Sequence, residues 1–139
     1  AKSKDKEIQL KIGSETKEEN ISTEEGKTIE YISEYDPKTR NITKDTYFQD
    51  DGKTIKSIFE YDPKTRNKTK RTYSREDGKT IDHIEEYDPK TGNIIKATTF
   101  RKDGKTIRYI AEGDPITGKI TKGTYFREDG KTIEHIEEY

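Results

Sequence analysis

The sequence predicts an all-β protein, built as an antiparallel meander of β-hairpins in one open, largely single-layer sheet. Three observations lead to this prediction. A 26-residue unit recurs without insertions, strand-forming residues hold fixed places inside it, and two turn signals divide each unit into halves. A fixed period is typical of one supersecondary unit copied in tandem, with each copy packing mainly on its neighbours.

The string Gly-Lys-Thr-Ile begins every unit, and its five glycines are Gly26, Gly52, Gly78, Gly104 and Gly130. This spacing divides residues 26–139 into four and a half units of one continuous domain, which are 26–51, 52–77, 78–103, 104–129 and 130–139. Residues 1–25 lack the string. Their apolar residues Ile8, Leu10, Ile12 and Ile21 predict a degenerate N-terminal hairpin that caps the stack.

Each unit contains an Asp-Pro turn signal and an Asp-Gly turn signal. In the first, Asp36 can accept hydrogen bonds from backbone amides, and Pro37 fits the second position of a turn. The fifth position of this signal is Arg40, Arg66, Gly92 or Gly118. This alternation predicts a four-residue hairpin loop that ends in a residue with left-handed backbone conformation, which glycine adopts most easily. The Asp-Gly pair, first seen at Asp51 and Gly52, predicts a two-residue hairpin turn.

A short helix is the alternative for the segment before each Asp-Pro loop. Ile29, Ile32 and Tyr35 have the spacing i, i+3, i+6, which fits one helical face. The segment has only about eight residues between glycine and proline, is rich in β-branched side chains, and lacks an N-cap pattern. A strand is therefore the favoured interpretation.

Hairpins at both turns predict a register in which Tyr35 pairs with Ile42 and Phe48 pairs with Ile55. The predicted central row on the same face is Tyr31, Thr46, Ser57, Thr72, His83, Thr98, Tyr109, Thr124 and His135. The opposite face then receives the isoleucine stripe Ile32, Ile58, Ile84, Ile110 and Ile136, with Tyr47, Tyr73 and Tyr125 beside it. The row Lys44, Lys70, Lys96 and Lys122 falls on the first face, which disfavours closure into a barrel. A barrel and a face-to-face dimer of sheets are the alternatives to the open sheet.

Composition excludes several classes of function. Apolar residues make up only 25% of the chain, which predicts an unusually thin core. The 28 basic residues are balanced by 29 acidic ones, so there is no basic surface for nucleic acid or an anionic membrane. The chain has no cysteine, and no apolar run approaches the roughly 20 residues of a membrane span.

Several motifs resemble catalytic or metal-binding motifs but lack the residues or the spacing that these sites require. The Gly-Lys-Thr strings lack the earlier glycine of a phosphate-binding loop. His83 and His135 fall two units apart, about 19 Å across a sheet, too far to share a metal ion. The carboxylates of Glu34, Glu60 and Glu86 lie about 10 Å apart, but a flat sheet offers no cleft to raise one pKa. The sequence therefore predicts neither an enzyme nor a cofactor site.

The string from Asp77 to Gly92, D-G-K-T-I-x-x-I-x-E-Y-D-P-K-T-G, resembles a tandem-repeat domain of unknown function found in mollicutes, especially phytoplasmas. The resemblance spans residues 26–139 and breaks at Gly113 and Ile116. It implies a wall-less, host-associated bacterium and a secreted or surface-exposed protein, but it carries no known activity.

We expect a non-catalytic interaction protein that binds a protein partner, or itself, through a striped sheet face. The residues predicted to form this face are Ile29, Tyr35, Phe48, Ile55, Phe59, Tyr61, Ile81, Tyr87, Phe100, Ile107, Phe126 and Ile133. The alternative is a module that binds a glycan or another extended polymer.

Overall fold

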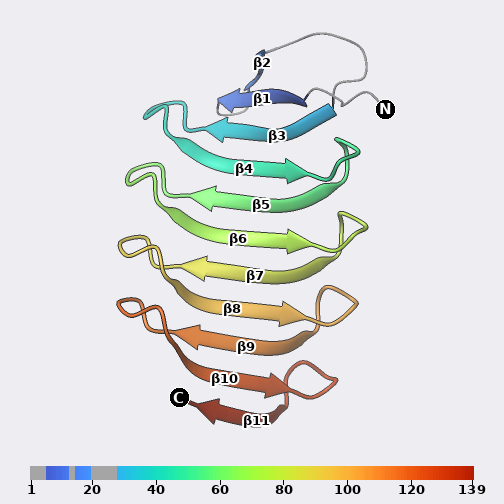
Figure 1. Ribbon diagram of the computed structural model, residues 1–139, viewed down its shortest axis with the longest axis vertical. Helices are drawn as coiled ribbons and strands as arrows, with labels where there is room; N and C mark the ends of the chain where they lie inside the picture. Colours follow the sequence, from blue (N-terminus) through green and yellow to red (C-terminus); the bar gives the residue numbers. More distant parts are fainter. Residues whose placement is uncertain (1–5, 13–14, 20–27) are drawn as a thin grey trace.

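The computed structural model describes residues 6–12, 15–19 and 28–139, and every element in these ranges is a β-strand (Figure 1). The strands are β1 Lys6–Ile12, β2 Glu15–Glu19, β3 Thr28–Tyr35, β4 Ile42–Phe48, β5 Ile55–Tyr61, β6 Lys68–Ser74, β7 Ile81–Tyr87, β8 Ile94–Phe100, β9 Ile107–Gly113, β10 Ile120–Phe126 and β11 Ile133–Glu138. They form one sheet in the order β11-β10-β9-β8-β7-β6-β5-β4-β3-β1-β2.

The repeat strands β3 to β11 pair antiparallel with their neighbours in chain order, which confirms the predicted nine-strand meander. The strand order is linear and begins and ends with different strands, so the sheet is open and the barrel does not form. At the N-terminal end β1 and β2 make an antiparallel hairpin, and β1 pairs parallel with β3. Residues 1–5, 13–14 and 20–25 of the predicted capping segment, and residues 26–27 of the first unit, lie outside the described residues.

The Asp-Pro loops have the predicted form. The amide of Arg40 donates to the carbonyl of Asp36 at 2.9 Å, and the amide of Asp36 donates to the carbonyl of Asn41 at 2.8 Å. The fifth loop position has a positive φ in all four loops, 65° at Arg40, 68° at Arg66, 79° at Gly92 and 73° at Gly118. Glycine adopts this left-handed conformation without the steric cost that arginine incurs, as the sequence predicted.

The Asp-Gly loops differ from the prediction, because each contains four residues rather than two. The amide of Gln49 donates to the carbonyl of Thr54 at 2.8 Å, and the intervening residues 50–53 form the loop. Gly52 has φ 69°. The carboxylate of Asp51 accepts hydrogen bonds at 2.8 Å from the amides of Lys53 and Thr54. The aspartate therefore caps the exit of the loop and does not occupy a two-residue turn.

One β-bulge beside the loop of each repeat hairpin shifts the register of the strand interiors. The predicted pairs Tyr35 with Ile42 and Phe48 with Ile55 are confirmed beside the loops. One extra residue then intervenes on one strand, so Tyr31 pairs with Tyr47 and not with Thr46. The eight extra residues are Thr43, Lys56, Thr69, Asp82, Ile95, Arg108, Thr121 and Glu134.

The bulges redistribute side chains between the two faces, so the predicted rows are wrong in the strand interiors. Paired residues share a face, and β4 has no extra residue between Tyr47 and Phe48. These two side chains therefore point to opposite faces. Tyr47, Tyr73 and Tyr125 join the face of Tyr31, and the lysine row moves to the other face, opposite the glutamates.

We name the two faces by their central rows. The aromatic face has the central row Tyr31, Tyr47, Ser57, Tyr73, His83, Thr99, Tyr109, Tyr125 and His135. The isoleucine face has the central row Ile32, Thr46, Ile58, Thr72, Ile84, Thr98, Ile110, Thr124 and Ile136.

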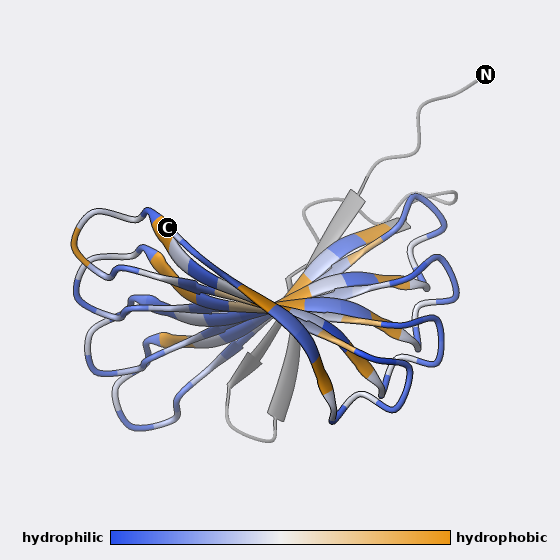
Figure 2. Ribbon diagram, turned by 90° about the horizontal axis from the view of Figure 1, so that it is seen from below, coloured by the Kyte–Doolittle hydropathy of each residue, from blue (hydrophilic) through white to orange (hydrophobic). Residues whose placement is uncertain are grey.

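The sheet twists along its length, and neither face carries a second layer in the described part of the chain (Figure 2). Such twist is a general property of strands of L-residues, and bulges increase it. Among the described residues, the buried apolar side chains are Phe59 and Ala111, each 8% exposed. The thin core predicted from composition is confirmed.

Hydrogen bonds between successive units hold the loops together at both margins of the sheet. On the Asp-Pro side, the side-chain amide of Asn41 donates a hydrogen bond to the carbonyl of Pro63 at 2.7 Å. The side-chain amide of Asn93 donates one to the carbonyl of Pro115 at 2.9 Å. On the Asp-Gly side, the Arg75 guanidinium donates to the carbonyl of Phe100 at 3.0 Å. These side chains connect each unit to the next, which compensates for the small apolar core.

Candidate interaction surface

The structure divides the predicted contact residues between the two faces. Four lie on the aromatic face, Tyr35, Phe59, Tyr61 and Tyr87. The others lie on the isoleucine face, Ile29, Phe48, Ile55, Ile81, Phe100, Ile107, Phe126 and Ile133. The bulges cause this division, because they reverse the side of the residues next to each Asp-Gly loop. The predicted residues therefore form two surfaces instead of one.

On the aromatic face, the rings of the central row stack against one another from strand to strand. The rings of Tyr73 and His83 are stacked with centroids 4.0 Å apart, and those of Tyr125 and His135 with centroids 4.3 Å apart. Tyr109 lies 4.5 Å from Tyr125. Each ring of a stacked pair has one face covered by its neighbour, and Ser57 and Thr99 divide the row into separate groups of rings. The histidines thus act as members of an aromatic ladder.

Beside this ladder lies a buried polar and aromatic cluster around Asp45. The Ser33 hydroxyl donates to Asp45 at 2.5 Å, and the Tyr61 hydroxyl donates to it at 3.1 Å. Burial, together with the negative charge of Asp45, raises the pKa of Tyr61. Phe59 lies next to this cluster, with the Arg71 guanidinium 4.2 Å from its ring centroid. Phe59 was predicted to contact a partner, but its ring belongs to the core of the sheet.

The isoleucine face has two neighbouring uncharged rows and one charged row. The outer uncharged row contains Phe48, Ile55, Ser74, Ile81, Phe100, Ile107, Phe126 and Ile133. The charged row alternates glutamate and lysine, and consists of Glu34, Lys44, Glu60, Lys70, Glu86, Lys96, Glu112, Lys122 and Glu138. Within it, the Lys44 and Lys70 ammonium groups each lie 3.9 Å from a glutamate oxygen on the preceding strand. The two uncharged rows give this face a continuous band without a charged residue.

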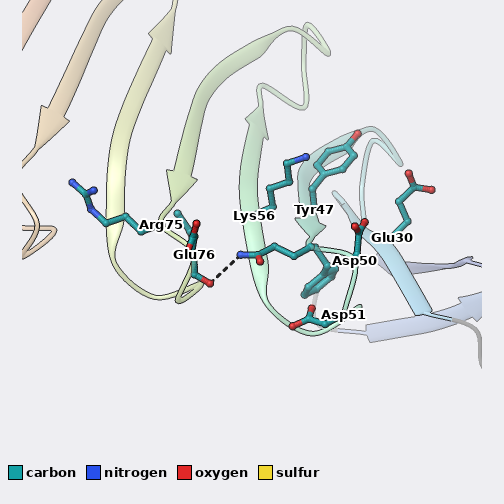
Figure 3. Close-up of a pocket in the computed structure, with 10 residues that line it drawn as sticks. Glu30, Tyr47, Asp50, Asp51, Lys56, Arg75 and Glu76 are labelled. Carbon is teal, nitrogen blue, oxygen red and sulfur yellow. Dashed lines mark hydrogen bonds between the residues drawn. The ribbon is translucent and has the colours of Figure 1, made fainter. Parts of the chain in front are cut away.

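Open grooves run between successive Asp-Gly loops at one margin of the sheet. The first has a volume of about 550 Å³ and is lined by Tyr47, Asp51, Lys56, Arg75 and Glu76 among others (Figure 3). The side-chain amide of Gln49 crosses it and donates a hydrogen bond to the backbone carbonyl of Glu76 at 3.1 Å. Asp51 holds its own loop, as described above. In the part of the chain that the structure describes, no cluster of three histidine, aspartate or glutamate side chains could hold a metal ion.

The loop aspartates make fold stability depend on pH. Hydrogen bonds from the following threonine and from backbone amides hold the pKa of four aspartates at about 2, below the ordinary 3.8, namely Asp51, Asp77, Asp103 and Asp129. A carboxylate whose pKa is lowered by folding stabilises the folded state. This stabilisation is complete above about pH 3.8 and is lost as the pH falls toward 2. We expect the thermal midpoint to fall over this window. Replacing Asp77 and Asp103 with asparagine should lower the midpoint at neutral pH and flatten the pH profile, whereas Asp50→Asn should leave the profile unchanged.

Among the described residues, no helix is long and apolar enough to cross a membrane. A search of curated protein sequences found no match. The chain resembles a solved structure of a mutant of S. aureus TarM in complex with fondaparinux, alpha-GlcNAc-glycerol and UDP, with a TM-score of 0.55 and 13% sequence identity. This match covers 81% of the chain but only 20% of the TarM chain, and it concerns the fold alone.

The repeat itself matches a known family three times in tandem. The matched segments are residues 23–73, 75–125 and 111–139. Together they include the repeat strands β3 to β11, except for Ser74 at the end of β6. The chain therefore belongs to the family described as protein of unknown function (DUF2963).

Proposed function

We propose that the chain is a non-catalytic binding protein whose isoleucine face docks on the surface of another protein molecule. One observation carries this proposal: the nine repeat strands have no covering layer, and only two apolar side chains of the described residues are buried. Nine strands about 4.8 Å apart, each about 20 Å long, give a face on the order of 900 Å². That area matches the roughly 800 Å² that each partner contributes to a stable protein interface.

The isoleucine face suits a protein partner better than the aromatic face does. Its two adjacent rows, those of Ile58 and Ile55, contain only isoleucine, phenylalanine, threonine and serine. On the aromatic face, the row next to the ring ladder includes Asp45, Arg71 and Glu85. Interface centres are depleted of charged residues, and charges gather at the rim. The charged row of Glu60 and Lys70 forms such a rim on the isoleucine face.

Glycan binding is the weaker candidate function. Tyrosine rows on the aromatic face support it, but a sugar packs on the open face of an aromatic ring. Tyr73 and His83 cover one face of each other's ring, and Tyr125 and His135 do the same. The ladder thus offers less of the flat surface that a sugar ring would use.

The test of the binding function is a double substitution, Ile58→Lys with Ile84→Lys, in the centre of the isoleucine face. Both self-association and capture of proteins from an extract of the source organism are measured, because either would use the same face. We expect affinity to fall more than about 100-fold, since two buried lysines would replace central contacts. The matched control is Ile94→Lys with Ile120→Lys on the aromatic face, where exposures are 37% and 54%. Unchanged association by a folded Ile58 and Ile84 variant would contradict the proposal.

We also propose that the protein acts outside a mollicute cell, either secreted or held at the surface. Only the resemblance of the repeat to phytoplasma proteins supports this localisation. Protease treatment of intact source cells should degrade the protein while sparing cytoplasmic markers. Protection of the protein until the cells are lysed would contradict it.

A further inference from the structure

The side chains of the isoleucine face alternate with strand number. Odd-numbered strands from β3 to β11 place an isoleucine in the central row and a glutamate in the charged row, as Ile58 and Glu60 do on β5. Even-numbered strands place a threonine and a lysine there, as Thr72 and Lys70 do on β6. The central row and the charged row therefore alternate together. A strand with a large central side chain carries an acidic residue, and a strand with a small one carries a basic residue.

This alternation gives the face a relief of ridges and hollows. Thr98 and Thr124 are each 7% exposed, because they lie between the larger isoleucines of adjacent strands. The interior isoleucines Ile58, Ile84 and Ile110 are partly exposed. In the central row, odd strands thus form ridges with negative charge in the neighbouring charged row, and even strands form hollows with positive charge there. Side chains of two packed sheets interdigitate in this way when large residues meet small ones.

We propose that the occupant of the isoleucine face is a second copy of the chain, packed face to face with odd strands opposite even strands. This inference rests on the proposed function, since it names the partner of the same face. A two-fold axis parallel to the strands keeps each row opposite its own copy and reverses the strand order. When the axis passes between two neighbouring strands, isoleucine meets threonine and glutamate meets lysine.

Other arrangements lack this complementarity. A two-fold axis directly over a strand would place glutamate opposite glutamate and lysine opposite lysine, which is unfavourable. Edge pairing of two β11 strands would bring together the carboxylates of Glu134, Glu137 and Glu138. With at most eight repeat strands of each copy opposed, the offset face-to-face dimer would bury on the order of 1,500 Å² in total, within the range of stable interfaces. It would also give the thin sheet the second layer that β-sandwiches have.

Charge exchange between two variants tests the pairing of the rows. The acidic variant carries Lys70→Glu and Lys96→Glu, and the basic variant carries Glu60→Lys and Glu86→Lys. Each alone should dimerise at least about 30-fold more weakly than the wild type, because like charges then face each other. Their mixture should recover affinity to within about 3-fold, as a heterodimer. The control carries Lys64→Glu and Lys90→Glu in the Asp-Pro loops. It changes the net charge by the same amount as the acidic variant and should dimerise like the wild type. Dimer formation is followed by light scattering and folding by circular dichroism.

A measurement on the wild type keeps the test decisive if a charge variant does not fold. Unlabelled and ¹⁵N-labelled chains are mixed and joined with a zero-length carbodiimide cross-linker. Intermolecular links between the glutamate row and the lysine row are expected. Their absence, or normal dimerisation of the folded acidic and basic variants alone, would overturn the pairing. A wild type that stays monomeric at about 100 μM overturns the second copy as partner. The binding function would still stand if Ile58→Lys with Ile84→Lys abolished capture of another protein.

Discussion

Replacing Phe59 with alanine is expected to lower the free energy of unfolding by about 3 kcal/mol, the low end for a buried phenylalanine. Phe59 is 8% exposed and is the largest buried apolar side chain of the described residues. Its ring packs edge-on against Tyr47, with centroids 5.8 Å apart, and lies 6.3 Å from the ring of Tyr61. The charged ends of Lys68 and Arg71 cover it at 4.4 and 4.2 Å. Truncation removes these contacts and opens the only aromatic centre of the thin core that the structure describes.

The conservative variant Phe59→Leu separates ring contacts from simple burial. Leucine keeps most of the apolar surface but loses the cation–π contacts, which contribute about 0.5–1 kcal/mol each. We expect a loss of about 1–1.5 kcal/mol, measured by urea unfolding of the full chain with the same m-value as the wild type. A loss below about 1 kcal/mol for Phe59→Ala would show that the ring is a surface contact, as the sequence had suggested, and not part of the core.

The strand count, the meander and the left-handed residue of the Asp-Pro loops could be predicted because each depends on local signals that the repeat copies. The bulges could not be found in the same way. Thr43 and Lys56 are polar like the residues that follow them, Lys44 and Ser57, so either register produces plausible rows near the loops. Only the strand interior distinguishes the two registers. That is why the pairs next to the loops were predicted correctly and the central row was not.

A signal for the correct register was present in cross-strand charge. The unshifted register pairs Glu34 with Thr43, whereas the observed register pairs Glu34 with Lys44 and repeats this complementarity along the sheet. The threonine at the bulge adds a second signal, because its hydroxyl donates to the carbonyl of the opposing glutamate, at 3.1 Å from Thr43 to Glu34. Testing both registers for charge pairing would have favoured the bulged one.

The candidate site was predicted only in part for a different reason. On the isoleucine face, each unit copies the same side chains, so a row can be recognised from one unit. On the aromatic face, the row next to the ring ladder holds a different residue on almost every strand, including Ser33, Asp45, Phe59 and Arg71. A contact between Asp45 and Ser33 depends on having these two residues on neighbouring strands. The other units have different residues at these positions, so the repeat pattern does not predict the contact. The copied face is the one expected to act as a continuous surface.

Asp45 shows what the variable row contributes, and Asp45→Ala should lower the free energy of unfolding by about 3 kcal/mol. Its carboxylate is 6% exposed and accepts hydrogen bonds from Ser33 at 2.5 Å and from Tyr61 at 3.1 Å. Hydrogen bonds to a charged group contribute about 1.5–3 kcal/mol each. Alanine would also leave the Ser33 hydroxyl, 3% exposed, without its partner.

A double-mutant cycle with Ser33→Ala measures how much of this loss belongs to the pair. We expect a coupling energy above about 1 kcal/mol, because Ser33→Ala removes the donor that Asp45→Ala leaves unsatisfied. Asp45→Asn keeps an acceptor and should cost only about 1 kcal/mol. Asp45→Leu tests the opposite case. If the desolvation free energy of the buried carboxylate exceeds the free energy of its hydrogen bonds, this variant would be more stable than the wild type. A more stable Asp45→Leu variant would mean that Asp45 specifies how Tyr61 and Phe59 are arranged without adding to stability.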